Sequence, residues 1–413
     1  MSKENKHALS KAEELIPEMR FPEFEKDGEW ELKSISSIAK VSAGGTPSST
    51  EPKYWGGNIP WMNSGELNLK RVYSVENYIT SLGLKESSTK MIPPLCVLIG
   101  LAGQGKTRGT AAINYIELCT NQSIAAIHPN KENFNSEFLY HKIDSMYKAL
   151  RSLSTGQGGR GGLNLSIIRE IEIPFPLIKE QQKIASCLSS LDDLIAAHSD
   201  KLETLKDHKK GLMQNLFPQK GQKVPNYRFP EFEKDGEWSE KEIGRIADNL
   251  DSRRVPITSN KREKGDIPYY GASGIIDYVN EYIFNEELLL ISEDGANLIA
   301  RVYPIAFSIS GKSWVNNHAH VLKFEKWFTQ VLVEKYLNSK NIEDFLTGMA
   351  QPKLNRQKLD LIPIPLPKSE EEQQKIASCL SSLDELITAQ SEQIEQLQQH
   401  KKGLMQGLFP NTK

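Results

Sequence analysis

The chain repeats itself, and this internal duplication limits its possible folds more than any other feature of the sequence. Three segments recur almost letter for letter: "RFPEFEKDGEW" at 20–30 and 228–238, "EQQKIASCLSSLD" at 180–192 and 372–384, and "HKKGLMQ" followed by one variable residue and "LFP" at 208–218 and 400–410. Both halves of the 413 residues therefore follow one plan, and each half is long enough to bury a core.

The regions between the repeated segments have diverged. Short echoes remain, such as "GNIPW" from Gly57 and "GDIPY" from Gly265, or "TNQ" from Thr120 and "VNN" from Val315. We infer that the repeated ends perform the same task twice, whereas the diverged regions perform one kind of task on two different objects.

The segments that close each half predict two long helices. Alternating steps of four and three from Ile184 and from Ile376 give eight apolar residues in ten positions, a heptad pattern typical of a coiled coil. A helix from Ile184 to Leu216 would span about 50 Å at roughly 1.5 Å per residue. The seam includes Ile184, Leu188, Leu191, Ile195, Leu202 and Leu205 in the first copy and Ile376, Leu380, Leu383, Ile387, Ile394 and Leu397 in the second.

Two matched seams in one chain predict helices that pair with each other. The polar seam residues would then help to set the register; they are His198, Lys209, Gln390 and Lys401. The alternative is that each helix packs only on its own domain.

The diverged regions, 31–178 and 239–368, are rich in Gly, Pro and Asn, and their short apolar runs predict strands separated by turns. Strands are expected in "PPLCVLIG", "AAINYI", "SIAAIHP", "ELLLISED", "YPIAFSIS" and "HAHVLKFE", and helices over 137–153 and 329–346. The predicted organisation is a first domain over 1–178, a first long helix over 179–217, a second domain over 218–370 and a second long helix over 371–413.

The stretch Gly100–Thr107, "GLAGQGKT", fits the phosphate-binding P-loop pattern. A working P-loop needs a helix directly after the Lys-Thr pair, but Gly109 and a strand-like apolar run follow here, and the sister loop Ser292–Asn297 lacks the pattern. We therefore expect a glycine-rich hairpin loop whose polar side chains face phosphate oxygens and base edges, with a plain solvated turn as the alternative.

Composition excludes several classes. The net charge of −2 argues against a protein that coats nucleic acid unaided, and no apolar run approaches the roughly 20 residues of a membrane span. The N-terminus lacks a signal core and the four cysteines suit neither zinc nor disulfides, so a cytoplasmic location is expected. His318 and His320 lack a third ligand nearby in sequence, so no metal is expected. No catalytic signature stands out, and the chain is expected to be non-catalytic.

Taken together, the motifs closely resemble the specificity (S) subunit of type I restriction–modification systems. The resemblance is carried by "RFPEF", "GGTPSSTEPKYWGGNIPW", "GDIPYYGASGIIDYV", "EDGANL", "WVNNHAHVL" and the "EQQKIA" to "LFP" helices, and it covers essentially the whole chain. It implies an α+β fold in which two α/β target recognition domains are separated by two long helices that form an antiparallel coiled coil with pseudo-two-fold symmetry.

The resemblance also implies the partners. Each recognition domain would read one half of a split, asymmetric site in double-stranded DNA, and the coiled coil would set the spacing and dock two methyltransferase (M) subunits, through which restriction (R) subunits join. No cofactor is expected on this chain, because S-adenosylmethionine, ATP and Mg belong to those partners.

On this reading, the candidate DNA contacts are polar, basic and aromatic side chains of the matched loops. They are Asn58, Trp61, Asn63, Gln104, Lys106, Arg108 and Arg160 in the first half and Arg253, Arg254, Tyr270, Ser273, Asn297, Lys312, Asn316, Lys353 and Arg356 in the second. Three alternatives stay open: a P-loop ATPase, a coiled-coil adaptor whose domains bind proteins, and the specificity module of a related methylation or phage-defence system.

Overall fold

The computed structural model describes residues 15–103, 105, 107–153, 162–348 and 351–410. The chain divides into two compact units. Unit 1 comprises the residues up to His198 together with those from Gln393 onward, and unit 2 comprises Ser199–Glu392. Each unit therefore combines one globular domain with a stretch of both long helices. The predicted domain boundaries lie near the ends of the helices, whereas the compact units divide within them.

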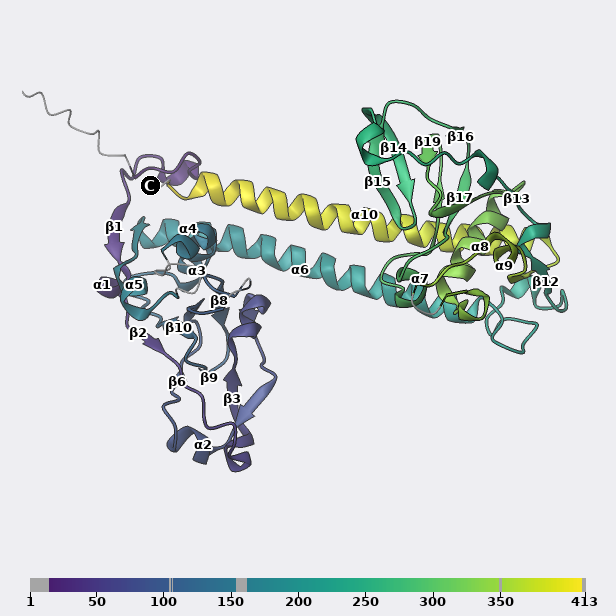
Figure 1. The fold of residues 1–413 in the computed structure, drawn as a ribbon. Helices are drawn as coiled ribbons and strands as arrows, with labels where there is room; N and C mark the ends of the chain where they lie inside the picture. The colour runs from purple at the N-terminus through teal and green to yellow at the C-terminus, as the bar shows by residue number, and fades with distance from the viewer. Residues whose placement is uncertain (1–14, 104, 106, 154–161, 349–350, 411–413) are drawn as a thin grey trace, which may run out of the picture. The chain divides into compact units, whose positions relative to one another are not determined.

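Unit 1 is built around two sheets (Figure 1). The five-stranded sheet has the order β2 (Val41–Ala43), β10 (Ile124–Ile127), β7 (Val97–Gly100), β8 (Ala111–Asn114), β4 (Arg71–Val72), and the four-stranded sheet has the order β5 (Asn77–Ile79), β3 (Trp55–Met62), β9 (Leu118–Thr120), β6 (Met91–Ile92). A separate pair joins β1 (Glu31–Ser34) to β11 (Glu172–Phe175). The helices of this domain are α1 (Ile35–Ile38), α2 (Ser81–Lys85), α3 (Ser136–Ser145), α4 (Tyr147–Ser152) and α5 (Leu165–Glu170).

Unit 2 repeats this plan with smaller sheets. Their orders are β13 (Asp248–Asn249), β20 (Ala319–Lys323), β17 (Leu288–Ser292), β18 (Ala306–Ile309), and β15 (Gly274–Val279), β14 (Lys264–Gly271), β19 (Lys312–Val315), β16 (Phe284–Asn285). The lone pair is β12 (Ser239–Glu242) with β21 (Pro363–Leu366), and the helices are α7 (Asn297–Ala300), α8 (Trp327–Ser339) and α9 (Arg356–Asp360).

Continuous apolar runs place the central strands in the core. Every residue of β7, β8, β10 and β17 is buried, because helices cover one face of each central sheet and a second layer covers the other. All six predicted strands are confirmed, and the segment after the P-loop-like stretch is β8 rather than a helix.

The echo between "GNIPW" and "GDIPY" marks one construction in both domains. β3 pairs antiparallel with β5 and parallel with β9, and β14 pairs in the same way with β15 and β19. At Gly57 and at Gly265 a Cβ atom would lie 2.4 Å from a backbone oxygen of the neighbouring strand. Glycine is required at both positions because the partner backbone occupies the space of a side chain.

The long helices α6 (Ile178–Asn215) and α10 (Glu370–Leu408) contain 38 and 39 residues. In unit 1 the beginning of α6 (Ile184, Leu188) shares a core with the end of α10 (Leu404, Leu408). In unit 2 the end of α6 packs in the same way with the beginning of α10. The helices are therefore antiparallel where they meet, which confirms the predicted pairing, and each helix also packs on the domains.

Two predicted helices differ from the helices that the structure shows. The helix expected over 137–153 is interrupted at Met146, and the one expected over 329–346 stops at Ser339, where Lys340 becomes extended. The Asn341 side chain then accepts a hydrogen bond from the amide of Glu343 (2.7 Å) and starts a short 3-10 turn. Among the described helices, none has a stretch long and apolar enough to cross a bilayer.

Candidate nucleic-acid interface

The repeated "RFPEF" segments are anchored to the long helices by buried ion pairs. Arg20 donates two hydrogen bonds to the carboxylate of Glu180 (2.8 and 2.7 Å), and Arg228 does the same to Glu372 (2.7 and 2.6 Å). Both carboxylates are fully buried. The hydrogen bonds that each guanidinium donates to its carboxylate raise the pKa of that guanidinium. Each domain is thus fixed to the start of the helix that follows it.

A second set of ion pairs links the two helices and the domain beside them. Lys401 of α10 pairs with Asp192 of α6 in unit 1, and Lys209 of α6 pairs with Asp384 of α10 in unit 2. Each aspartate also binds one cation of the neighbouring domain. Arg71 from β4 lies 3.2 Å from Asp192, and Lys335 from α8 lies 2.9 Å from Asp384. The predicted register role of Lys209 and Lys401 is supported by these ion pairs.

Arg71 is the centre of a buried network in unit 1 that sequence reasoning missed. Its guanidinium lies 2.9 Å from Glu137 and also contacts the Tyr115 hydroxyl. His141, which is fully buried between Glu137 and Asp192, has a pKa far below its ordinary value because burial and nearby cations disfavour its charge. The repeated Asp-Lys pairs could have signalled this junction, but the domain cations occupy unrelated sequence positions.

The P-loop-like stretch begins at the end of β7 and lies in the connection between β7 and β8, which pair antiparallel as a β-hairpin. The amide of Gly109, whose φ is +80°, donates to the carbonyl of Gly100 (2.9 Å), and a Cβ on Gly100 would lie 2.2 Å from Thr107 O. The glycines therefore serve the close crossing of two strands. Of the predicted contacts here, Arg108 is half-buried, whereas Gln104 and Lys106, like Arg160, lie outside the described residues.

Two loops at the same edge of each domain are joined by equivalent backbone hydrogen bonds. In unit 1 Leu101 binds Ser123 O, and Leu163 binds Leu101 O (2.8 and 2.9 Å). In unit 2 Glu293 binds His318 O, and Leu354 binds Glu293 O (2.9 and 2.8 Å). In each unit these bonds join the loop after β7 or β17 to the segment that precedes α5 or α9.

Several predicted contact residues are committed to intramolecular bonds. They are Trp61, which is buried and donates to Gly45 O; Asn63, which caps a 3-10 helix; Arg254, which binds Glu293 and Asp251; Asn297, which binds Tyr303; and Asn316, which accepts from the amide of His318. These side chains hold the domains together, so fewer of the predicted residues are available to contact a ligand than the sequence suggested.

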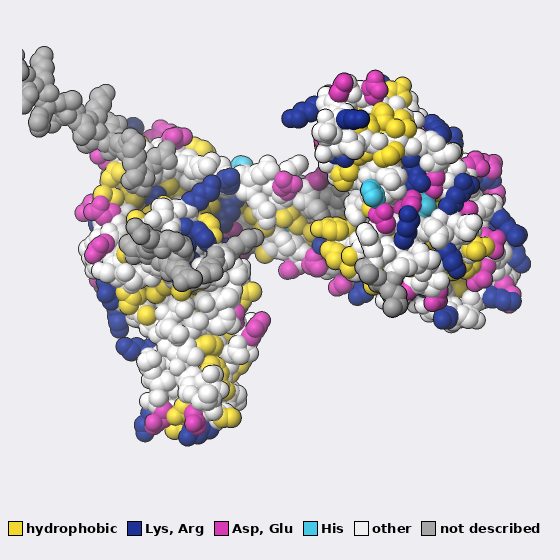
Figure 2. All heavy atoms as spheres, viewed as in Figure 1, with side chains coloured by type: hydrophobic (Ala, Val, Ile, Leu, Met, Phe, Trp, Pro, Cys, Tyr) yellow, Lys and Arg dark blue, Asp and Glu magenta, His cyan; other side chains and the backbone are white. Residues whose placement is uncertain are grey.

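Other predicted residues lie at the surface. They are Asn58, Arg253, Ser273, Lys312, Lys353 and Arg356, with Tyr270 half-buried. Arg253 pairs with Glu286, Lys353 with Glu293 and Arg356 with Asp360, while Lys312 lies 4.9 Å from the ring centre of Tyr282. Figure 2 accordingly shows Lys and Arg side chains interspersed with Asp and Glu over unit 2, and hydrophobic side chains over β14 and β15. The latter include exposed Ile275, Ile276 and Tyr278.

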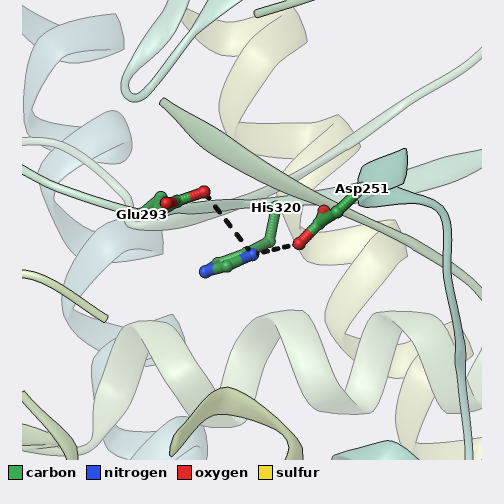
Figure 3. Close-up of side chains that lie close together, drawn as sticks. All are labelled: Asp251, Glu293 and His320. Atoms are coloured by element: carbon green, nitrogen blue, oxygen red, sulfur yellow. Dashed lines mark hydrogen bonds and ion pairs between the residues drawn. The ribbon is translucent and has the colours of Figure 1, made fainter. Parts of the chain in front are cut away.

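Sequence reasoning also missed a polar cluster beneath the loops of unit 2. Asp251, Glu293 and His320 come from three separate segments, and their side chains converge with the imidazole between the two carboxylates (Figure 3). Nδ1 of His320 lies 2.6 Å from Asp251 and 3.8 Å from Glu293. The sequence search considered only residues close to His318 and His320, whereas the acidic partners of His320 lie far away in the sequence.

Comparisons with known proteins agree on one family. The family model described as "Type I restriction modification DNA specificity domain" matches residues 27–207 and 235–399. The MjaIX specificity subunit of a type I restriction enzyme from Methanocaldococcus jannaschii is 30% identical over 308 residues, covering 68% of this chain and 70% of its own. The MjaVIII specificity subunit of the same organism is 24% identical and covers 94% of this chain and 92% of its own.

A solved structure shares the fold. The type I restriction–modification S subunit from M. genitalium superimposes with a TM-score of 0.64 at 17% sequence identity, over 96% of this chain and 100% of that one. The fold of this chain is thus one already seen in an experimental structure.

Proposed function

This chain belongs to the type I restriction–modification DNA specificity family, and from that premise we propose that each of its two domains recognises one half of a bipartite, asymmetric site in double-stranded DNA. The chain itself performs no catalysis. Two methyltransferase subunits dock on the paired helices and carry S-adenosylmethionine, and restriction subunits with ATP and Mg join through them in the cytoplasm.

The observation that carries this proposal is a contrast between the contacts that both units repeat, which we call the frame, and the loops, which differ. Both units repeat the Arg–Glu anchor, the Asp–Lys pair and the backbone bonds that join the two loops. The loop side chains differ between the units almost completely. A shared frame suits one kind of ligand, and divergent loops suit two different base sequences.

Matched apolar residues on the helices support the docking of identical partners. Leu194 of α6 is 43% exposed, and Leu386, which occupies the equivalent repeat position on α10, is 57% exposed. Each leucine leaves about half of its surface open to a partner, and both repeats have one at the same place. Replacing either leucine by lysine should remove one copy of the methyltransferase partner from the complex, and replacing both should remove two, as measured by native mass spectrometry.

The decisive experiment is a domain exchange. Replacing residues 31–178 with the equivalent region of another family member should change one half of the methylated sequence in the host genome and leave the other half unchanged. The unaltered chain provides the reference, and exchange of 239–368 should change the opposite half. If a single exchange altered both halves, or neither, the assignment of one domain to one half-site would be wrong.

A further inference from the structure

One turn is built in the same way in both units, at the point where the chain passes from one sheet of the domain to the other. In unit 1 it joins β9 of the four-stranded sheet to β10 of the five-stranded sheet. In unit 2 it joins β19 to β20, which likewise belong to different sheets. The echo between "TNQ" and "VNN" falls here. We call residues 121–123 and 316–318 the matched turns.

The matched turn of unit 1 is held at both of its ends. The amide of Asn121 donates to the carbonyl of Met62 at the end of β3 (3.0 Å), and its side-chain Oδ1 accepts from the amide of Ser123 (3.1 Å). The carbonyl of Ser123 accepts from the amide of Leu101, directly after β7 (2.8 Å). Because an asparagine that binds the amide two residues later closes a turn by itself, the side chain of Gln122 is not needed to hold the backbone.

The matched turn of unit 2 has the same three bonds. The amide of Asn316 donates to the carbonyl of Tyr270 on β14 (3.0 Å), and its Oδ1 accepts from the amide of His318 (2.8 Å). The carbonyl of His318 accepts from the amide of Glu293, directly after β17 (2.9 Å). Since β14 and β17 occupy the places of β3 and β7 in the strand orders, the matched turns belong to the frame.

The middle residue of each matched turn takes no part in these bonds. It is Gln122 in unit 1 and Asn317 in unit 2, and both side chains are exposed. Each therefore presents a carboxamide, whose oxygen accepts and whose NH2 group donates hydrogen bonds. The predicted contact Asn316 is 5% exposed and supports the turn instead. A fixed backbone that carries one exposed polar side chain suits recognition, because binding has to order little.

Both carboxamides keep most of their hydrogen-bonding capacity. Oε1 of Gln122 accepts from the hydroxyl of Thr46 (2.6 Å), and the NH2 group and the second lone pair of Oε1 have no partner among the described residues. The segment that carries Thr46 is itself fixed, because the amide of Gly45 donates to the carbonyl of Thr120 (2.8 Å). The Asn317 side chain has no hydrogen bond within the part of the chain that the structure describes. These groups are available to a ligand.

Adenine is the base whose edge a carboxamide matches. In the major groove adenine offers an amino donor at N6 beside an acceptor at N7, and the oxygen and the NH2 group of a carboxamide satisfy both. Guanine offers two acceptors at the same edge and cytosine offers a donor, so neither matches the pair. For Gln122, the second lone pair of Oε1 is sufficient to accept from N6 while Thr46 holds the first.

We propose that Gln122 and Asn317 are specificity-determining residues, each of which reads one adenine in the major groove of the half-site recognised by its own unit. This inference rests on the proposed function and adds to it one residue and one base in each half-site. Asn121 and Asn316 are positioning residues, which act by holding the turn. A shared frame thus presents one shared group, and the surrounding loops differ.

The test measures the base preference of the full complex at every position of the site. The chain assembled with its methyltransferase partners is equilibrated, at constant salt, with the cognate duplex and with duplexes that each carry one base-pair substitution. We expect Q122A to lower the preference for adenine at a single position of the unit 1 half-site by between about fivefold and about 150-fold. N317A should do the same at a single position of the unit 2 half-site.

Carboxylate variants give a sharper outcome. Q122E and N317D keep the shape of the side chain but replace the NH2 donor by a second acceptor, so the preferred base at the affected position should change from adenine to cytosine, whose N4 amino group donates. A side chain that met only phosphate would instead weaken binding to all duplexes alike when it became a carboxylate. N121A keeps Gln122 but removes the bond to Ser123, and it should reduce the same single preference as Q122A.

Two other exposed carboxamides serve as matched controls. Asn68 in unit 1 and Asn280 in unit 2 each donate a hydrogen bond within their own unit (2.9 and 2.7 Å). N68A and N280A should therefore keep every base preference of the unaltered complex. Because all these substitutions lie at the surface, thermal unfolding should stay the same, which shows that a lost preference is not a lost fold.

The outcomes separate this inference from the proposed function. Unchanged preferences in Q122A or in N317A, or a loss spread evenly over all positions, would overturn the assignment of the two carboxamides. If the unaltered complex distinguishes its cognate duplex and the variants behave like it, this inference alone fails. If the unaltered complex does not distinguish the cognate duplex from one in which both halves are scrambled, the proposed function fails with it.

Discussion

The buried pair of Arg20 and Glu180 offers the sharpest test of how a domain is fixed to its helix. The pair has two parallel hydrogen bonds, the carboxylate is fully buried, and the arginine side chain is 7% exposed. Removing one partner of such a pair leaves a buried charge and costs about 3–5 kcal/mol. We therefore expect R20M to lower the free energy of unfolding of unit 1 by that amount, and its midpoint temperature by roughly 6–20 °C.

The assay is denaturant unfolding followed by the fluorescence of Trp30, which is buried in the same core. The double variant R20M/E180L replaces both charges by apolar groups and should recover most of the loss, because no charge remains buried. E25Q, at an exposed carboxylate in the same segment, should change stability by less than about 0.5 kcal/mol. If R20M proved no more destabilising than E25Q, the ion pair would not stabilise the attachment of the domain to its helix, and the reasoning would be refuted.

Three further predictions concern the frame. Burial lowers the pKa of Lys142 to about 8. Between about pH 8 and about pH 10.5 the unfolded chain binds more protons at this group than the folded chain, so the contribution of Lys142 to the stability of unit 1 should rise with pH. Unfolding curves taken at several pH values should therefore show the unaltered chain gaining stability relative to K142M across that range. G265A should destabilise unit 2 by about 2 kcal/mol or more in thermal unfolding, whereas G403A on α10, where a Cβ meets nothing within 4 Å, should be neutral or stabilising by up to about 1 kcal/mol. A double-mutant cycle of K209M and D384N should yield a coupling energy of about 1–3 kcal/mol, and additivity would contradict the helix register.

Sequence reasoning succeeded where local pattern decides structure. The heptads from Ile184 and Ile376 predicted the long helices, and the apolar runs around Val97, Ala111 and Leu288 predicted buried strands. The helix predicted over 329–346 is too long, since α8 ends at Ser339, because an apolar face can continue past the point where the backbone turns.

The polar junctions could not be predicted in the same way. Arg71 meets Asp192, and Asp251 meets His320, across long sequence separations that only the folded chain brings together. Nothing in the sequence around Asp251 says that its side chain meets His320. Candidate DNA contacts such as Arg254 were chosen by their charge, but the charge of a residue does not reveal whether it already pairs with an acidic side chain of the same domain.

The way α10 completes unit 1 has a consequence for the order in which the protein matures. Unit 2 consists of one continuous stretch, Ser199–Glu392, so all of its residues are translated before the part of α10 that completes unit 1. The core of unit 1 also needs Leu408 and Phe409, which are translated after every residue of unit 2. The domain made first therefore closes last, and a chain whose translation stops early is left with an open, aggregation-prone core that cellular proteolysis can remove.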